Sequence, residues 1–222
     1  GKIKNNENIA RSILEIVQAS VGENKNKINY KFLLFYLSIA NLLDPNFNEG
    51  YYYSAQIYQI LKKYSRSEYF YSKISSSHRL FLDSQKNIAV NLTKVGLFGE
   101  GEKYLEKLNN DYKNNASLLI ALANIYRVKE KYEEAIKYYS IIIDINDNNF
   151  YEYWRVLYLR GICFERVNNW KLAEKDFLHS LRVKKNSPQV LNYLAYGWLE
   201  RNQNINTAFD MLIKAYEENP SS

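Results

Sequence analysis

The sequence is poor in the residue types that most often carry catalytic or metal chemistry. Its 222 residues include one cysteine, Cys163, and two histidines, His78 and His179. A single cysteine can form neither an internal disulfide nor a cysteine-based metal cage. The two histidines lie far apart in the sequence, whereas a metal site needs its ligands close together. We therefore predict that the chain binds no metal ion and needs no cofactor.

Glycine and proline are also scarce, with 8 and 3 residues respectively. An all-β sandwich needs many tight turns, and such turns depend on these two residues. Helices joined by short polar turns need few of either. Because hydrophobic residues still make up 46% of the chain, it can bury a substantial core. The composition therefore favours an ordered, helical chain.

Long apolar runs are missing as well. The longest, residues 32–43, is interrupted by Tyr36, Ser38 and Asn41 and is shorter than the roughly 18 residues that span a bilayer. We predict no transmembrane segment in this chain. No signal peptide is visible, but the sequence begins at Gly1 rather than at Met, so a leader in a longer gene product is not excluded.

The net charge is +6 and the pI about 9.1, which by itself could indicate an anionic partner. The lysines, however, are scattered among Glu and Asp instead of forming a basic stripe. A clustered footprint is what nucleic-acid binding requires. We therefore expect no nucleic-acid partner.

Residues that could suggest catalysis have simpler explanations. Cys163 has Arg160 and Arg166 nearby in sequence but no histidine to act as a base, so we interpret it as a small packing residue. Glu133 and Glu134 open a predicted helix, where carboxylates complement the helix dipole. We predict that the chain is not an enzyme.

A repeated arrangement of small and large residues dominates the sequence. In the clearest copy, Ala123 is followed by Tyr126, then by Ala135 twelve places after Ala123, and by Tyr139. Other copies, spaced by 34 or 38 residues, are Ala55, Tyr58, Ser67 and Tyr71; Ala89, Leu92, Gly101 and Leu105; Gly161, Phe164, Ala173 and Phe177; Ala195, Trp198, Ala208 and Leu212. A fixed period of this length is typical of stacked helical repeats.

Each copy predicts two antiparallel helices that cannot bury their apolar faces alone. The small residues mark the place where the two backbones approach most closely, and the large residues fill the grooves beside them. We predict an all-α chain and a single domain, 1–222, with units at about 7–47, 48–81, 82–115, 116–149, 150–187 and 188–220. The first unit is diverged: a helix is expected at 8–21, ending at Gly22, and Leu33 stands where a small residue is usual.

The best copy resembles the tetratricopeptide repeat, whose pattern is Trp-x2-Leu-Gly-x2-Tyr, then Ala-x3-Phe, then Pro. The matching residues here are Leu119, Leu122, Ala123, Tyr126, Ala135 and Tyr139. The final Pro is missing from several copies, where Asp147 and Lys185 stand instead. The resemblance implies an α-solenoid of antiparallel helix pairs that forms a right-handed superhelix of about six units.

The segment 191–196, with Arg201-Asn202 and Thr207-Ala208, looks like the corresponding unit of a broader bacterial group. The resemblance covers most of the chain and is closest to multi-repeat tetratricopeptide proteins of alphaproteobacteria. That resemblance implies that the chain is a fragment of a longer repeat protein. Many of those proteins are exported, so the resemblance points to an exported or periplasmic location, with the cytoplasm as the alternative.

In this family the first helix of each pair lines the concave face of the superhelix. The residues that the resemblance places on that face are Tyr52, Gln56, Gln59, Lys86, Val90, Thr93, Ile120, Asn124, Arg127, Tyr158, Ile162, Glu165, Asn192, Tyr196 and Leu199. Aromatic anchors and amides dominate this set, and both suit an extended or helical peptide. The alternative is an inner face that is merely solvated.

Two functions remain open. The first is a non-catalytic scaffold that binds a protein or peptide on its concave face; the identity of that partner cannot be read from the residues. The second is a structural subunit whose repeats pack into a larger assembly. Phe209, Leu212 and Tyr216, with Ile213 beside them, form an apolar stripe on the last predicted helix, through which we expect self-association.

Overall fold

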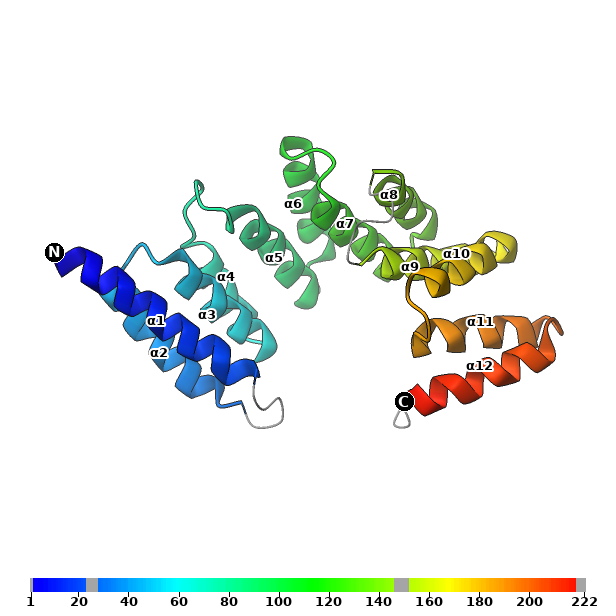
Figure 1. The fold of residues 1–222 in the computed structure, drawn as a ribbon. Coiled ribbons are helices and arrows are strands. Elements are labelled where there is room, and N and C mark those ends of the chain that lie inside the picture. The colour runs from blue at the N-terminus through cyan, green and yellow to red at the C-terminus, as the bar shows by residue number, and fades with distance from the viewer. Residues whose placement is uncertain (1, 23–27, 146–151, 219–222) are drawn as a thin grey trace. The chain divides into compact units, whose positions relative to one another are not determined.

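The computed structural model describes residues 2–22, 28–145 and 152–218, and these residues form twelve α-helices without a β-strand (Figure 1). In chain order the helices are α1 (Lys2–Gly22), α2 (Tyr30–Leu43), α3 (Asn48–Ile60), α4 (Tyr64–Tyr71), α5 (Phe81–Lys94), α6 (Phe98–Asp111), α7 (Ala116–Val128), α8 (Tyr132–Ile145), α9 (Tyr153–Arg166), α10 (Trp170–Val183), α11 (Pro188–Glu200) and α12 (Ile205–Glu218). The predictions of an all-α chain and of about six helix pairs are confirmed.

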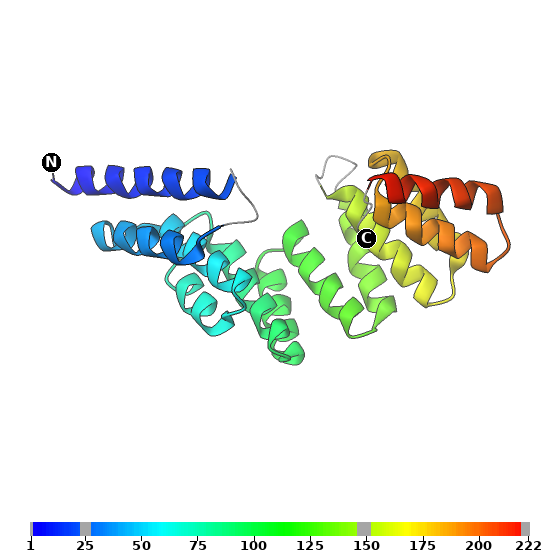
Figure 2. The same ribbon diagram turned by 90° about the horizontal axis from the view of Figure 1, so that it is seen from below.

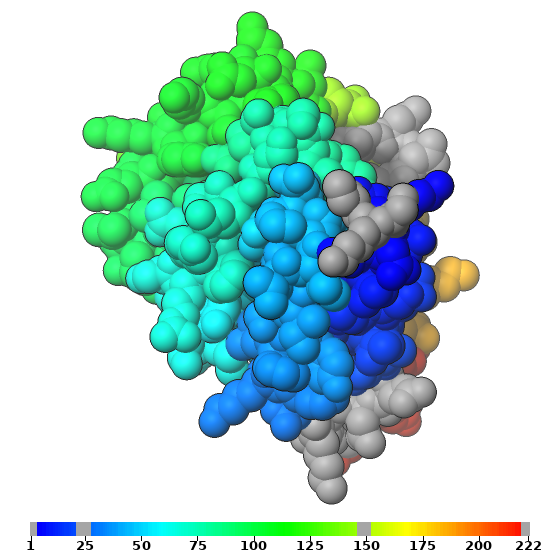
Figure 3. Space-filling view, turned by 90° about the vertical axis from the view of Figure 1, so that its left-hand side faces the viewer, coloured from blue at the N-terminus to red at the C-terminus, as the bar shows by residue number. Residues whose placement is uncertain are grey.

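The chain divides into two compact units, Gly1–Leu108 and Asn109–Ser222, which are described separately. In the first unit, α1 lies along α2, as Figure 2 and the space-filling view in Figure 3 both show. Leu33, the large residue at the usual small position, is buried with Val17, Leu37 and Ile57. Helix α1 ends at Gly22 as predicted but begins at Lys2, six residues earlier, since no Gly or Pro interrupts the segment.

The second unit contains α7 to α12. Its buried core on α10, α11 and α12 gathers Phe177, Leu194 and Trp198 around the small residues Ala173 and Ala195. Helices α7 and α8 contribute further fully buried side chains, Leu118, Leu122, Tyr139 and Ile142. Both helices of each pair thus turn one apolar side inward, as a period of 3.6 residues requires.

The repeated small residues lie at close helix contacts. They are all buried: Ala55, Ser67, Ala89, Gly101, Ala123, Ala135, Gly161, Ala173, Ala195 and Ala208. A Cβ added to Gly101 would lie 2.7 Å from the carbonyl oxygen of Ala89, and one added to Gly161 would lie 2.7 Å from the Phe177 ring. The helices of these pairs could not approach so closely with larger residues at these positions.

The turns inside the pairs from α3 to α12 share one hydrogen-bonded motif, to which the last turn adds a second positive-φ residue, Asn204 (43°). At the centre of each turn a residue adopts positive φ: Lys62 (56°), Gly96 (89°), Glu130 (59°), Asn168 (60°) and Asn202 (53°). In the turn after α7, the Lys131 amide donates to the Tyr126 carbonyl (2.9 Å) and the Glu130 amide to the Arg127 carbonyl (3.1 Å). Equivalent bonds close the other four turns. This is the Schellman motif, which satisfies the last carbonyls of the first helix and reverses the chain.

A buried ion pair adds a contact that the apolar pattern does not contain. The Arg160 guanidinium on α9 donates to both carboxylate oxygens of Asp176 on α10, at 2.7 and 2.8 Å, and to the Ser140 hydroxyl on α8 at 3.0 Å. The Asp176 side chain is almost fully buried. One guanidinium therefore ties three consecutive helices of the second unit together.

Replacing Glu130 by Gly should raise the free energy of unfolding by about 0.5–1 kcal/mol, because Gly takes positive φ without the steric cost that other residues bear. Chemical denaturation measures the change. Val128→Gly, at the last residue of α7, is the control and should lower stability, because glycine gains no steric advantage at a helical φ. Destabilisation by both variants would mean that the turn carries no strain.

Asp176→Asn should lower the free energy of unfolding by about 3–5 kcal/mol, because it leaves the largely buried Arg160 guanidinium without its counter-charge. The double variant Arg160→Met with Asp176→Leu should recover much of this loss, since neither residue then carries a buried charge. Thermal melts followed by circular dichroism give both values. Equal losses in the single and double variants would show that packing, not charge pairing, sets the effect.

Candidate binding surface

The predicted concave-face residues of the first unit lie on α3 and α5, and all six are partly exposed. Tyr52 donates its hydroxyl to the Asp83 carboxylate, and Lys86 pairs with the same carboxylate. Burial, with the added effect of the Asp83 hydrogen bond and charge, raises the pKa of Tyr52, so the phenol stays protonated and remains a donor. Sequence reasoning missed Asp83, although its place three residues before Lys86 on one helix face was a signal.

Gln59 serves the packing of the first unit. Its amide nitrogen donates to Asn91 Oδ1 at 2.7 Å, and its amide oxygen accepts from the Tyr71 hydroxyl at 2.8 Å. Asn91 is buried and donates to Ser67 Oγ at 3.0 Å. Because these bonds join α3, α4 and α5, replacing Gln59 would disturb the helix packing as well as any peptide contact.

Three predicted residues of the second unit lie on α7. The Oδ1 atom of Asn124 accepts a hydrogen bond from the Tyr139 hydroxyl at 2.7 Å. Ile120 and Arg127 are partly exposed. The Nε atom of Arg127 is buried and has no hydrogen-bond partner among the described residues. Burial raises the pKa of the Cys163 thiol to about 12, against a smaller lowering by Arg127. The thiol is therefore protonated at neutral pH, as expected of a packing residue.

The other six predicted residues lie on α9 and α11. Tyr158 is partly buried, with its ring centroid 5.7 Å from that of Tyr193 and 6.1 Å from that of Phe177. Burial raises the pKa of Tyr158 to about 12. Ile162 and Leu199 pack against the core cluster, whereas Tyr196 is 58% exposed. Asn192 is partly exposed. Tyr196 is therefore the most exposed of these six residues.

A cleft of about 270 Å³ opens beside Tyr196, and we name it the aromatic cleft. Its lining residues are Glu165, Arg166, Trp170, Tyr193, Tyr196, Gly197 and Glu200. The structure thus brings two predicted residues, Glu165 and Tyr196, to one site. Tyr193 is one of the tyrosines off the packing stripe, but the repeat did not place it on the concave face. Sequence reasoning also left out Trp170, which begins the second helix α10, and Arg166, Gly197 and Glu200, which lie near the ends of the first helices α9 and α11.

Gly197 gives the aromatic cleft its shape. A Cβ added there would lie 2.1 Å from the Cη2 atom of Trp170, so the indole rests directly on the α11 backbone. The Arg201 guanidinium lies 4.2 Å from the centroid of the Trp170 ring, and the indole nitrogen donates to Gln203 Oε1 at 3.3 Å. A glycine inside a helix is unfavourable unless something needs the space, and Gly197 was therefore a signal in the sequence.

Charges of both signs border the cleft. Arg166 lies 3.6 Å from the Glu165 carboxylate and hydrogen-bonds the Tyr193 hydroxyl, while Arg201 lies 3.5 Å from the carboxylate of Glu200. A ligand in the cleft would therefore meet aromatic surface together with hydrogen-bond donors and acceptors. Trp, Tyr and Arg are the residues most enriched at the energetic centres of protein interfaces.

Comparison with known proteins agrees with the repeat. No family model matches the chain. A TPR repeat-containing protein of Methanocaldococcus jannaschii is 25% identical over 215 aligned residues, which cover 78% of this chain and 37% of that protein. The chain therefore spans well under half of the curated relative that it matches.

Solved structures share the arrangement of helices. Yeast Tom70 gives a TM-score of 0.77 at 17% identity, and the aligned part covers 94% of this chain and 43% of the Tom70 chain. The APC/C hetero-tetramer Cut9–Hcn1 gives 0.71 at 13% identity, covering 98% and 45% respectively. A MamA structure gives 0.58 at 18% identity over 79% of this chain and 98% of that one. The chain has the tetratricopeptide-repeat fold.

Within this tetratricopeptide-repeat fold, all fifteen predicted residues lie on the first helices α3, α5, α7, α9 and α11, six in the first unit and nine in the second. Fourteen are partly exposed and Tyr196 is exposed. Their role in binding stays a prediction.

None of the described helices is both long and apolar enough to cross a bilayer. Among the residues that the structure describes, no three His, Cys, Asp or Glu side chains gather as a metal site would require.

Gly197→Ala should lower the free energy of unfolding by about 1–3 kcal/mol, because the new methyl group overlaps the Trp170 ring and forces it to move. Tryptophan fluorescence should shift to longer wavelength as the indole becomes hydrated. Gly99→Ala on α6 is the matched control, since a Cβ there meets nothing within 4 Å and the helix favours Ala. An unchanged spectrum and melt for Gly197→Ala would mean that Trp170 does not rest on α11 in solution.

Proposed function

We propose that the chain is a non-catalytic scaffold that binds an extended or helical segment of another protein, with the aromatic cleft as the anchoring site. The exposed Tyr196 beside the fixed Trp170 carries the proposal. An aromatic side chain held in place before binding loses little conformational entropy when a ligand arrives. The Trp170 ring, packed on Gly197 and Arg201, meets this condition, and Tyr196 adds exposed aromatic surface beside it.

The neighbours support this reading. Cut9–Hcn1 of the APC/C is a hetero-tetramer, that is, an assembly of different proteins, and a chain in it shares the fold described above. The same use of the fold here is a proposal, since identities of 13–18% establish the likeness of fold alone.

The absence of catalysis is part of the proposal, and it rests on how the reactive residue types are used. The Cys163 thiol is buried and protonated. His78 Nε2 lies 3.4 Å from the Glu49 carboxylate in a turn, and the His179 ring packs edge-on to Tyr153 at 5.7 Å. Each of these three groups takes part in a packing or turn contact with the described residues named here.

Tyr196→Ala should remove a partner captured from an extract of the source cells, while leaving the melting temperature of the chain nearly unchanged. Tyr69→Ala, on α4 of the first unit and 57% exposed, is matched in residue type and exposure and should keep the partner. Quantitative mass spectrometry of the captured proteins makes the comparison. If every protein captured by Tyr69→Ala is captured equally by Tyr196→Ala, the aromatic cleft is not the anchoring site.

A second function, assembly with further copies of the chain, is favoured by α12. Ile205, Phe209, Ile213 and Tyr216 are 45–64% exposed and follow one side of the helix. Leu212, expected in this stripe, instead packs partly buried against the core cluster that includes Ala208. The exposed stripe therefore runs through Ile213 and not through Leu212.

If α12 mediates self-association, replacing Phe209 and Ile213 together by Ser should lower the apparent mass at high concentration without changing the fold, because both side chains face solvent. Sedimentation velocity across a concentration series measures this. Leu212→Ser serves as the contrast and should destabilise the chain by about 1–3 kcal/mol, because it places a hydroxyl against the core. A wild-type chain that stays monomeric throughout removes the second function.

A further inference from the structure

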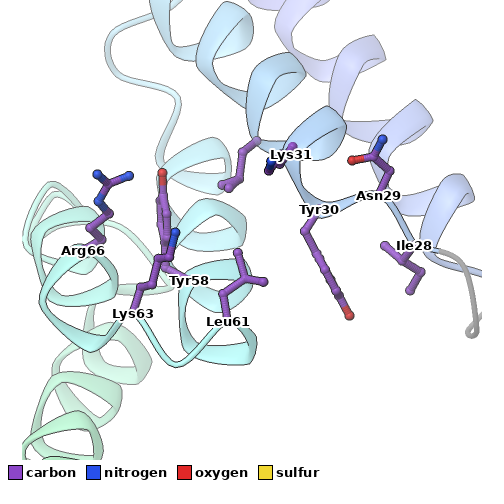
Figure 4. Close-up of a pocket in the computed structure, with 9 residues that line it drawn as sticks. Ile28, Asn29, Tyr30, Lys31, Tyr58, Leu61, Lys63 and Arg66 are labelled. Carbon is purple, nitrogen blue, oxygen red and sulfur yellow. The ribbon is translucent and has the colours of Figure 1, made fainter.

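The first unit contains a pocket that none of the predicted concave-face residues lines. It occupies about 740 Å³ between the first turn of α2, the last turn of α3 and the start of α4 (Figure 4). We name it the basic pocket. Its size is within the range of ordinary ligand sites.

Three cations line the basic pocket. Lys31 comes from the first turn of α2, Lys63 from the turn before α4, and Arg66 from the first turn of α4. No Asp or Glu is among the described residues that line it, and none of the three cations lies within salt-bridge distance of a described carboxylate. Elsewhere in the chain several cations do meet a carboxylate, as at Arg160 and Lys86. The pocket therefore attracts an anion.

The backbone positions of these cations are fixed. The Lys63 amide donates to the Tyr58 carbonyl at 2.8 Å as part of the Schellman turn. This bond holds the Lys63 backbone beside the pocket. The Arg66 guanidinium lies 5.7 Å from the centroid of the Tyr58 ring. The Arg66 charge is therefore held beside Tyr58, whereas the exposed Lys31 and Lys63 side chains extend from fixed backbone positions.

The rest of the lining is largely apolar. Leu34 and Leu61 are partly buried and pack against the same core cluster as Tyr30. Figure 4 shows Leu61 between Tyr58 and Tyr30, with Lys63 and Arg66 on the Tyr58 side. The Tyr58 ring is stacked on Phe70, with centroids 5.3 Å apart and planes 17° from parallel. A ligand must therefore bring apolar surface together with negative charge.

We propose that the basic pocket binds an acidic segment of a protein partner, with carboxylates placed at Lys31, Lys63 and Arg66 and a large aliphatic or aromatic side chain on Leu61 and Leu34. A nucleic acid fits less well, because the Tyr58 ring is already engaged by Phe70 and Arg66 and the cations do not form a stripe that could follow a phosphate backbone. The site is separate from the aromatic cleft and does not depend on it.

The test uses the whole chain and a fluorescein-labelled synthetic peptide in which Glu and Leu alternate. Fluorescence anisotropy should show saturable binding that weakens as salt is raised, since the attraction is partly screened. The double variant Lys31→Glu with Lys63→Glu should weaken binding by about tenfold or more, because two attractive contacts become repulsive. Lys103→Glu with Lys107→Glu changes the net charge equally on exposed positions of α6 and should bind like the wild type.

Two further probes decide the partner chemistry. A peptide with Ser in place of each Leu should bind at least tenfold more weakly; equal binding would show simple charge attraction and overturn the proposal. A labelled single-stranded oligonucleotide that binds more tightly than the peptide, and is lost in Lys31→Glu with Lys63→Glu, would assign the pocket to nucleic acid instead. Equal loss in the α6 control would likewise refute a specific site. Tyr196→Ala should not change peptide binding, so the outcome is independent of the aromatic cleft.

Discussion

The close approach of two helix backbones at small residues is the contact on which the rest of the structure depends. Where Gly101 meets the Ala89 carbonyl, or Gly161 meets the Phe177 ring, no side chain larger than the one present fits without displacement. A helix held this close to its partner leaves only a few side chains between the two. The remaining apolar surface must be covered by the neighbouring pair, which is why the chain repeats. Residues that take part in neither contact become available for binding.

That division explains why the two candidate sites differ in character. The aromatic cleft lies where a glycine on a first helix admits an indole from the preceding second helix, so its chemistry comes from rings that would otherwise be packing residues. The basic pocket lies where α2 meets the turn between α3 and α4, and its charges come from turn and first-turn positions that the repeat does not constrain. The repeat fixes the backbone at both places and specifies neither set of side chains.

The fold could be predicted from the sequence because small residues at a fixed spacing report on backbone distance, which is a property of the fold itself. The spacing of Ala123 and Ala135 is enough to predict two paired helices, whereas the Schellman turn between them was seen only in the structure. The start of α1 could not be placed in this way, because a segment without breakers gives no sign of where a helix begins. The change from Leu212 to Ile213 in the exposed stripe depends on the rotation of α12 about its axis, which adjacent apolar residues leave undetermined.

The candidate site was predictable only in part, for a related reason. Family register identifies which first-helix positions face inward, and it placed Tyr196 and Glu165 where a cleft is found. It carries no information about Trp170, which reaches the cleft from another helix, or about Asp83, which holds Tyr52 and Lys86 by hydrogen bonding and charge. Gln59 shows the opposite difficulty: it occupies an inward register position, yet its amide is engaged by Asn91 and Tyr71. Register gives the direction of a side chain, whereas its availability depends on neighbours that lie far away in the sequence.

Two modest sites in separate units would serve a scaffold better than one strong site. The aromatic cleft is small, so by itself it should bind weakly and release its segment readily. A partner that carries an apolar segment for the aromatic cleft and an acidic segment for the basic pocket would bind the second site at the effective concentration set by the linker between its segments. Affinity would then depend on whether that linker lets both segments bind at the same time. A partner that lacks one of the segments, or whose linker is too short, would bind through one site only and therefore weakly.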